Sequence, residues 1–241
     1  MRKPGENRCA SADFSGVRDW VFDLDNTLYP ARYRLFDQID QRMGAYISRL
    51  FDVDRAAARR IQKDYFYRYG TTLRGLMTEH GADPVAFLDF VHDIDYSHIP
   101  PDPALDAALA ALPGRKWVFT NGTAGHAEAV MNQLGVSGHI DEIFDITHAA
   151  YLPKPLAPAY AAFVEKTGID PRRAAMFEDI ARNLKRPHEM GMKTVLVEHP
   201  ENVDGGRINA RHGDAGAEYV HCVTHDLGAF LNALNTEKSA A

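Results

Sequence analysis

The chain has 241 residues, which is enough for one large domain or for a domain that carries an insertion. Its 45% hydrophobic and 25% charged residues are ordinary for a globular protein. Because the net charge is -6, general binding to nucleic-acid polymers or to anionic membranes is not expected. Any anionic ligand must therefore be held by a local site.

The first fifteen residues, MRKPGENRCASADFS, are polar and lack the apolar stretch of a leader. No run elsewhere approaches the ~20 apolar residues of a membrane helix. We therefore expect a flexible tail over 1–15 and a cytoplasmic protein without a membrane partner. Cys9 in this tail and the distant Cys222 are interpreted as incidental thiols, with a structural disulfide as the less favoured alternative.

The first predicted strand covers 17–24, VRDWVFDL, and runs into two aspartates, Asp23 and Asp25. Residues at positions i and i+2 of a strand share a face, so the two carboxylates are expected to point the same way. Carboxylates are costly beside an apolar strand, which makes this pair a candidate functional site.

A helical block follows this strand. Apolar residues recur every three or four positions from 33 to about 50, and a second such pattern begins at Asp54, a common helix-capping residue, and runs to 69. Two shorter helical stretches precede IPPDP at 99–103, whose prolines cannot continue a helix. We therefore expect an all-helical insertion over 31–99.

After this boundary, predicted strands alternate with helices. The strands are expected at 116–122, 143–146, 174–179, 193–199 and 219–220, and the helices at 124–134, 156–166 and 225–234. Such alternation predicts an α/β fold with a doubly wound, mostly parallel sheet. Residues 16–30 and 100–236 would form this core, with a short tail at 237–241. The span 199–216, rich in Gly, Asn and Asp, is interpreted as a surface loop.

Polar residues stand at four strand ends of this predicted sheet. They are Asp23 and Asp25, Thr120 and Asn121, Lys154, and Glu178 and Asp179. In such sheets ligands bind beyond the carboxyl ends of the strands. Acids that converge from two strands repel one another unless a cation lies between them, and oxygen-only ligands favour Mg²⁺. A lysine and a hydroxyl supply donors for an anion, so the combination predicts phosphoryl transfer.

The motifs DLDNTLYP, TNG, PKP and FEDIARNL follow one another along the chain. In order and context they resemble the haloacid dehalogenase-like (HAD) hydrolase superfamily, and the resemblance covers nearly everything from about Val17 to Leu234. The helical insertion directly after the first motif resembles the C1 type of cap in this superfamily. The resemblance therefore implies a HAD-like, Rossmann-like core that carries an all-helical C1 cap.

This resemblance also implies roles for single residues. Asp23 would be the nucleophile that forms an aspartyl-phosphate, and Asp25 the general acid and then base, with a raised pKa. Asp23, the backbone carbonyl of Asp25 and the Asp179 carboxylate would hold Mg²⁺. Glu178 and Asn183 would lie near the metal or the lysine, without a fixed role. The phosphoryl oxygens would be held by Thr120, Asn121, Gly122 and Lys154.

The acid at position 25 separates two activities within the superfamily. The dehalogenases that give the superfamily its name resemble this chain but lack this acid. A halide leaves without a proton, whereas an alkoxide needs one. Asp25 therefore predicts a phosphomonoester hydrolase. The stretches 66–81 and 90–103 further resemble the pyrimidine 5′-nucleotidase branch, which implies a nucleoside monophosphate such as UMP or CMP as the substrate.

Substrate contacts from the insertion are expected around the YGTT turn. Thr71, Thr72 and Arg74 are the candidate substrate-binding residues there, and His92 and Tyr96 could line the site too. His92 is interpreted as a packed or surface histidine in preference to a ligand-binding one. Four aromatic residues at helical spacing are interpreted as cap core in preference to a base-stacking platform: Tyr65, Phe66, Tyr67 and Tyr69.

Several alternatives stay open at this level. The enzyme could be a general or sugar-phosphate phosphatase, or a phosphomutase that returns the phosphoryl group to its substrate. A non-catalytic phosphate-binding scaffold is disfavoured, because binding alone does not need a second, proton-donating aspartate. A monomer and a homodimer are both compatible with the sequence. The connections at 28–31 and 99–103 are expected to let the cap open and close.

Overall fold

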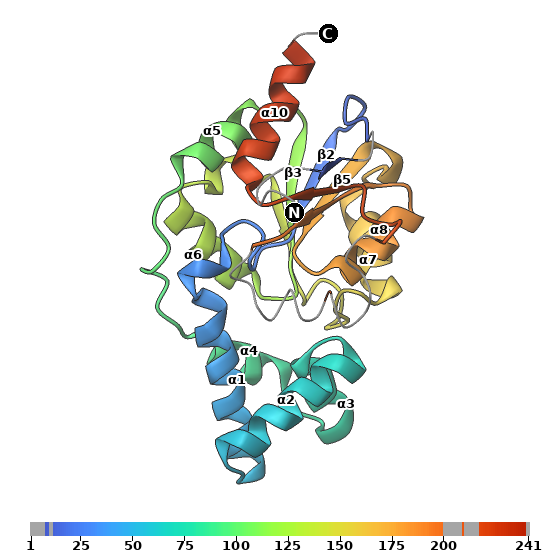
Figure 1. Cartoon of the computed structure of the whole chain (residues 1–241). Helices are drawn as coiled ribbons and strands as arrows, with labels where there is room; N and C mark the ends of the chain where they lie inside the picture. Colours follow the sequence, from blue (N-terminus) through green and yellow to red (C-terminus); the bar gives the residue numbers. More distant parts are fainter. Residues whose placement is uncertain (1–7, 10–11, 200–208, 210–216, 240–241) are drawn as a thin grey trace, which may run out of the picture.

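The computed structural model of the chain describes residues 8–9, 12–199, 209 and 217–239. Its centre is a seven-stranded sheet in the order β1-β7-β6-β5-β2-β3-β4 (Figure 1). The strands are β1 (Arg8–Cys9), β2 (Asp19–Phe22), β3 (Arg115–Phe119), β4 (Glu142–Phe144), β5 (Ala174–Glu178), β6 (Lys193–Val197) and β7 (Cys222–Thr224). All neighbouring pairs are parallel except β1 and β7. The predicted α/β fold with a mostly parallel sheet is confirmed.

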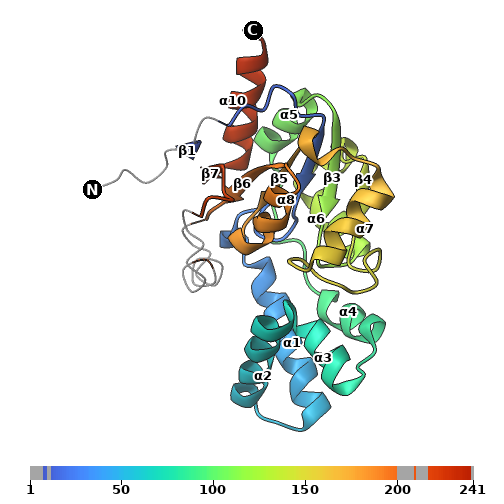
Figure 2. The same cartoon turned by 90° about the vertical axis from the view of Figure 1, so that its right-hand side faces the viewer.

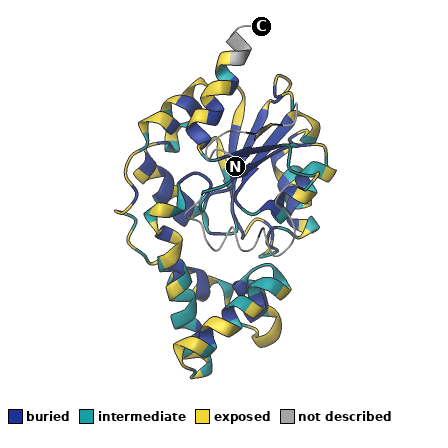
Figure 3. Cartoon of the chain, viewed as in Figure 1, coloured by how far each residue is buried: buried dark blue, intermediate teal, exposed yellow. Residues whose placement is uncertain are grey.

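Helices cover both faces of this sheet. They are α5 (Pro103–Ala111), α6 (Ala124–Leu134), α7 (Ala157–Thr167), α8 (Lys185–Glu189) and α10 (Leu227–Ser239). Successive residues of β2 point to opposite faces: Trp20 and Phe22 join a core with residues of α5, α6 and α10, whereas Val21 joins a second core with residues of α7. Figure 3 shows the buried strands lying between helices whose outer sides are exposed.

The register of the central strands brings their carboxyl ends together. Phe22 of β2 lies beside Val118 of β3 on one side and beside Phe177 of β5 on the other. The chain continues from Phe22 into Asp23 and from Phe177 into Glu178. Two carboxylates that are about 150 residues apart in the sequence therefore emerge at the same edge of the sheet.

Four helices follow β2 and lie beyond this edge of the sheet, in the lower part of Figure 1 and of the turned view in Figure 2. They are α1 (Leu35–Phe51), α2 (Arg55–Tyr69), α3 (Thr72–His80) and α4 (Pro84–His92), and we call them the cap. The side chains of Asp54 and Asp83 accept backbone N–H groups at the starts of α2 and α4. The cap has its own apolar core, to which Ile146 from the other side also contributes.

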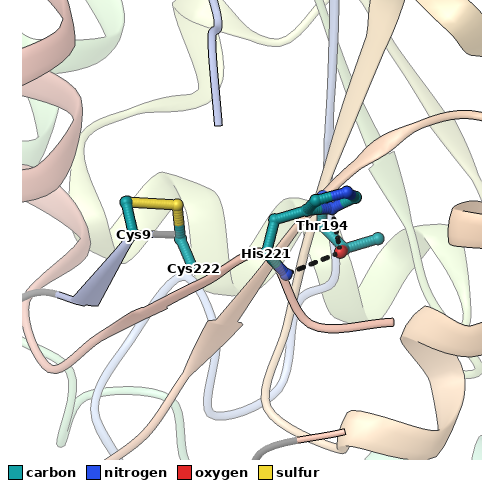
Figure 4. The surroundings of a disulfide bond; sticks show 4 residues. All are labelled: Cys9, Thr194, His221 and Cys222. Carbon is teal, nitrogen blue, oxygen red and sulfur yellow. Dashed lines mark hydrogen bonds between the residues drawn. A yellow bond between two sulfur atoms is a disulfide. The ribbon is translucent and has the colours of Figure 1, made fainter. Parts of the chain in front are cut away.

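The N-terminal segment corrects the interpretation of the cysteines. Arg8 and Cys9 pair with β7 in antiparallel register, and Cys9 lies directly opposite Cys222. The two residues form a disulfide, shown in Figure 4, and the described residues include no free cysteine. The expectation of two incidental thiols is therefore wrong. Its physical cause is strand pairing between distant segments, which a separation of 213 residues gives no means to foresee.

Two smaller points complete the fold. The last strand lies at Cys222–Thr224, just after the predicted 219–220, because those three residues are the buried ones. The predicted surface loop falls mostly outside the described residues, but Asn209 within it is buried. In the part of the chain that the structure describes, no helix combines the length and the apolar character needed to cross a membrane.

Candidate active site

Asp23 is held from three directions at the end of β2. Its backbone N–H donates to the carbonyl of Phe177, which continues the sheet by one residue. Its carboxylate accepts a hydrogen bond from Thr27 Oγ1 at 3.0 Å through Oδ2 and one from Lys154 Nζ at 2.7 Å through Oδ1. The predicted nucleophile is therefore buried and fixed in orientation before any ligand binds.

Lys154 lies at the centre of the buried charges. Besides Asp23, its ammonium group contacts Glu178 Oε2 at 3.1 Å and donates to the carbonyl of Phe119 at 2.8 Å. Asn183 donates from Nδ2 to the other oxygen of Glu178. Glu178 and Asn183 thus orient the lysine, which is one of the two roles left open by the sequence. The lysine is buried although it is charged, because two carboxylates neutralise it.

Burial is the largest influence on the pKa values of Asp23 and Glu178. It raises the pKa of Glu178 to about 8, with the nearby Asp23 carboxylate adding to the effect. It also raises the pKa of Asp23, although Lys154 opposes that shift. The pKa of Lys154 lies above its ordinary value, since attraction to the two acids outweighs its own burial. Because two acids share one lysine here, the local charge favours the binding of a further cation.

The carboxylates of Asp23, Glu178 and Asp179 could hold a metal ion. One oxygen from each lies within 4.8 Å of the others, and all three residues are buried. An all-oxygen donor set of this kind fits a hard divalent cation such as Mg²⁺. The Asp25 side chain is not part of this group, so any contribution from Asp25 would have to come from its backbone carbonyl, as expected.

The turn after β3 stands where the phosphoryl-binding residues were predicted. Thr120 is buried, and its hydroxyl accepts the backbone N–H of Gly122 at 2.9 Å. The Asn121 side chain pairs with both backbone groups of Lys154, at 2.9 and 3.2 Å, and so fixes the lysine's loop against β3. A Cβ atom built on Gly122 would lie 3.1 Å from the ring of His126. Glycine therefore permits a close approach of this turn to the histidine.

Asp25 has hydrogen-bond partners different from those of Asp23. Its Oδ1 atom accepts a hydrogen bond from Tyr29 Oη at 2.6 Å and lies 2.9 Å from Nε2 of the buried His126. Burial acts to raise the pKa of Asp25, but His126 and then Tyr29 outweigh it, and the pKa lies below its ordinary value. The raised pKa expected for the acid is therefore not a property of the unliganded site. A phosphate dianion beside Asp25 would raise it, because like charges repel.

The two cap residues named as uncertain lie beside this histidine. His92, at the end of α4, stacks on His126 with ring centroids 4.5 Å apart and bonds Thr123 Oγ1 through Nδ1 at 3.1 Å. Burial, followed by the neighbouring His126, lowers the pKa of His92 to about 3, so His92 is neutral. Tyr96 Oη lies 3.1 Å from Nδ1 of His126. His92 is thus a packed histidine, and it also borders the site.

A cavity of about 380 Å³ lies between the strand ends and the cap. Its core side includes most of the predicted site residues: Asp23, Asp25, Thr120, Asn121, Gly122, Lys154, Glu178, Asp179 and Asn183. Its cap side combines apolar residues with polar ones, and several of the polar residues gather around Asp40. The Asp40 carboxylate accepts from Gln62 at 2.8 Å, from Arg59 at 2.9 Å and from Lys63 at 3.2 Å.

Of the three cap residues predicted to bind substrate, two line the cavity and one does not. Thr71 and Thr72 line the cavity. Their hydroxyls have structural partners: Thr71 caps α3 by accepting the backbone N–H of Arg74, and Thr72 donates to the carbonyl of Gln62. Arg74 itself is not among the residues that line the cavity. The turn therefore borders the cavity, whereas the substrate-binding role of these three residues stays a prediction.

The aromatic residues of α2 also have different surroundings in the structure. Tyr65 packs in the cap core, as interpreted, and contacts His80 through its hydroxyl. Phe66 and Tyr67 instead line the cavity. The guanidinium of Arg182 lies 4.7 Å above the Phe66 ring and so joins the cap to the core.

Sequence reasoning missed four residues around the site. They are Tyr29, His126, Gln62 and Asn209. His126 lies in the first turn of the helix that follows TNG, a position facing the strand ends, and this spacing was its only sequence signal. Asn209 donates to the carbonyl of Asp179 at 3.0 Å and accepts from the backbone of Ala181 at 2.9 Å. Nothing in its local sequence links it to the acidic loop.

The fold and the site together define an α/β protein with a mostly parallel sheet, whose strand ends gather a lysine and several carboxylates beneath a helical cap. Residues 20–185 match the family described as haloacid dehalogenase-like hydrolase. The chain belongs to this family, as its motifs predicted.

One curated relative is phosphate metabolism protein 8 of Saccharomyces cerevisiae, which is 26% identical over 199 residues. The match covers 73% of this chain, but the chain spans only 60% of the length of the yeast protein. That name therefore belongs to a longer protein.

Solved structures give the same fold. The HAD phosphatase from Thermococcus onnurineus has a TM-score of 0.52 at 16% identity, covering 82% of this chain and 99% of that one. A defluorinating L-2-haloacid dehalogenase has a TM-score of 0.54 at 17% identity, covering 90% of this chain and 95% of that one. At these identities the likeness shows the fold alone, and it includes both phosphatases and dehalogenases.

Proposed function

We propose that the protein is a Mg²⁺-dependent phosphomonoester hydrolase that acts through an aspartyl-phosphate, with pyrimidine nucleoside 5′-monophosphates such as UMP and CMP as substrates. The observation that carries this proposal is the pairing of two carboxyls with different surroundings. Asp23 is fixed by Lys154, whereas Asp25, two residues later, is held by Tyr29 and His126. Such a difference suits one nucleophile and one proton carrier.

In the first step, an Asp23 oxygen attacks phosphorus and the bond from phosphorus to the leaving oxygen breaks. Asp25 gives its proton to that oxygen, so the product leaves as an alcohol. Lys154, 2.7 Å from Asp23, offsets the repulsion between the carboxylate and the phosphate dianion. Thr120 and the backbone of Asn121 and Gly122 would hold the phosphoryl oxygens.

In the second step, water attacks the same phosphorus and Asp25 takes up one of its protons. The bond between phosphorus and Asp23 breaks, which releases phosphate and restores both carboxyls. When bound by Asp23, Asp179 and the backbone of Asp25, Mg²⁺ would supply positive charge next to the transferred group.

The second acid favours phosphate esters over organic halides. A halide leaves without a proton, so a dehalogenase has no use for a carboxyl at this position. An alkoxide is a poor leaving group unless it is protonated, and Asp25 lines the cavity next to Asp23. The solved structures of similar fold include enzymes of both kinds, so the fold alone does not distinguish these two activities.

The cap side of the cavity supports a nucleoside as the leaving group. A cavity of about 380 Å³ is within the range of small-molecule sites. Phe66 and Tyr67 offer aromatic surface on which a base could stack. Gln62 donates to Asp40 at 2.8 Å, and the carboxylate of Asp40 and the carboxamide oxygen of Gln62 are acceptors suited to the N–H groups on the polar edge of a base.

A panel of phosphomonoesters tests the proposal. We expect phosphate release that requires Mg²⁺ and stops with a chelator, and kcat/KM values for UMP and CMP above those for sugar phosphates. If UMP and CMP rank no better than sugar phosphates, the nucleotide part is wrong. An isomer of the substrate without free phosphate would instead indicate a phosphomutase.

A further inference from the structure

We propose that His126 is a positioning residue for Asp25: together with Tyr29 it holds the Oδ1 atom of this carboxyl, so that the proton delivered to the leaving group is carried on Oδ2. The inference rests on the proposed function, since it concerns the acid of that reaction. It assigns a task to a buried histidine that the mechanism above does not use.

The two hydrogen bonds to Asp25 converge on one oxygen. Tyr29 Oη donates to Oδ1 at 2.6 Å, and His126 Nε2 lies 2.9 Å from the same atom. Among the described residues, no hydrogen-bond partner of Asp25 is found on Oδ2. An oxygen that accepts two hydrogen bonds is a poor proton carrier, because the two donors stabilise its negative charge. Oδ2 is therefore left as the oxygen that binds and releases the proton.

His126 can orient the carboxyl because its own ring is held on three sides. The side chain is fully buried, and Nδ1 contacts Tyr96 Oη at 3.1 Å. One ring face stacks on His92 with an angle of 4° between the planes. Gly122 leaves the space that brings the ring against the β3 turn. A ring fixed in this way keeps Nε2 aimed at Asp25.

Two of the groups that hold the ring lie at the end of the cap and just after it along the chain. His92 is the last residue of α4, and Tyr96 lies in the connection that returns from the cap to α5. The return connection therefore reaches the acid through one side chain. The orientation of Asp25 depends on this connection lying where the structure has it.

A purely structural role for His126 predicts a different outcome. If the histidine only fills space, removing it lowers the stability of the protein and slows all substrates alike. If it positions the acid, the loss depends on how much the leaving group needs a proton. p-Nitrophenolate leaves without one, whereas the alkoxide from UMP or glycerol 3-phosphate does not.

The test compares kcat/KM for these substrates in His126→Leu, which removes both ring nitrogens, and in His126→Gln, which keeps a donor near the Nε2 position. kcat/KM reports the step up to phosphoenzyme formation, in which Asp25 acts as the acid. We expect His126→Leu to lower kcat/KM for the alkyl esters by about 100-fold and for p-nitrophenyl phosphate by less than about 5-fold. His126→Gln should recover part of the loss on the alkyl esters.

Matched variants keep the test decisive if His126→Leu folds poorly. Tyr29→Phe removes only the second donor to Oδ1, and it should show the same dependence on the leaving group with a smaller loss. His139→Leu is the control, because His139 Nε2 contacts Asp106 Oδ1 at 2.7 Å in a similar pair away from the cavity. It should leave both substrates unchanged.

Two results would separate this inference from the proposed function. Equal losses on alkyl and nitrophenyl esters in His126→Leu and Tyr29→Phe, or no loss on either, would overturn the positioning role while the phosphatase stands. A wild-type protein that releases no phosphate from any ester, or an Asp23→Asn variant with full turnover, would overturn the proposed function itself.

Discussion

The two sides of the cavity differ in how their polar groups are arranged. On the core side, a buried lysine is shared by Asp23 and Glu178, and their positions follow from the ends of neighbouring parallel strands. On the cap side, both apolar and polar residues line the cavity, and the polar group around Asp40 and Gln62 joins helices α1 and α2. In the proposed reaction, the core side would carry the chemistry, whereas the cap side would contact the leaving group.

This contrast separates chemistry from selectivity. If the proposed function holds, changes on the core side should affect every substrate, because phosphomonoesters share the phosphoryl group. Changes on the cap side should affect substrates unequally, because they differ only in the leaving group. The predictions below test that division in order of their expected effect on turnover.

The largest effect is expected from Asp23→Asn. An amide cannot form the aspartyl-phosphate, so the loss of transition-state stabilisation should be at least about 4 kcal/mol, or about 1000-fold in rate. Steady-state phosphate release from UMP and from p-nitrophenyl phosphate should fall together. Substantial turnover of either ester would mean that the nucleophile lies elsewhere.

Lys154→Met should lower both activity and stability. It leaves the buried carboxylates of Asp23 and Glu178 without their shared cation, and breaking a buried pair costs about 3–5 kcal/mol. Denaturant unfolding without added metal measures the stability, and kcat for two unlike esters measures the activity. Lys166→Met is the matched control: its ammonium group contacts Glu142 at 3.3 Å on the surface and should change stability by less than about 0.5 kcal/mol.

Gln62→Leu should change selectivity more than rate. The carboxamide lines the cap side of the cavity and donates to Asp40, so its loss removes a polar contact for the leaving group alone. We expect KM for UMP to rise about 10-fold, as for one lost hydrogen bond to a polar group. kcat for p-nitrophenyl phosphate should stay near the wild-type value. Gln133→Leu, on an exposed position of α6, controls for the substitution itself.

Stabilisation by Mg²⁺ should grow as the pH rises from 6 to 8. Burial raises the pKa of Glu178 to about 8 and raises that of Asp23, so the folded, metal-free protein binds protons more tightly than the unfolded chain. Its stability therefore falls as the pH rises from the ordinary carboxyl pKa towards about 8. Mg²⁺ needs the ionised forms and removes this loss. Thermal melts with Mg²⁺ or a chelator measure the shift; a larger shift at pH 6 would contradict the metal site.

Cys9→Ser should leave turnover almost unchanged and lower stability. The disulfide lies at the opposite edge of the sheet from β4, away from the residues that line the cavity. Closing a loop of 213 residues stabilises the fold by up to about 5 kcal/mol in the chain-entropy account. Denaturant midpoints of the variant, and of the wild type with a reductant, should fall together. Equal midpoints in all three samples would show that the bond does not stabilise the protein.

The core side of the site could be predicted from the sequence, and the reason is geometric. Parallel strands end at one edge, so Asp23, Thr120 and Glu178 had to lie close together once the strands were recognised. The order of the motifs then resembled one superfamily, and the family match bears this out.

The parts that could not be predicted depend on rotation and register. Whether Phe66 or Tyr65 faces the cavity depends on a rotation of α2 by less than half a turn, and both residues are aromatic. The contact between His126 and Asp25 depends on how the first turn of α6 packs, which the sequence does not show. Cys9 meets Cys222 through a strand of two residues, which has too little pattern to read.

The short strand β1 also forms one edge of the sheet. By pairing with β7, it occupies backbone groups that would otherwise be open for pairing with another chain. Shortened versions that begin after Cys9 would present this edge to their neighbours in solution. A truncation made to remove an apparently dispensable tail is therefore expected to produce self-association, visible in light scattering, in a protein that still turns over its substrate.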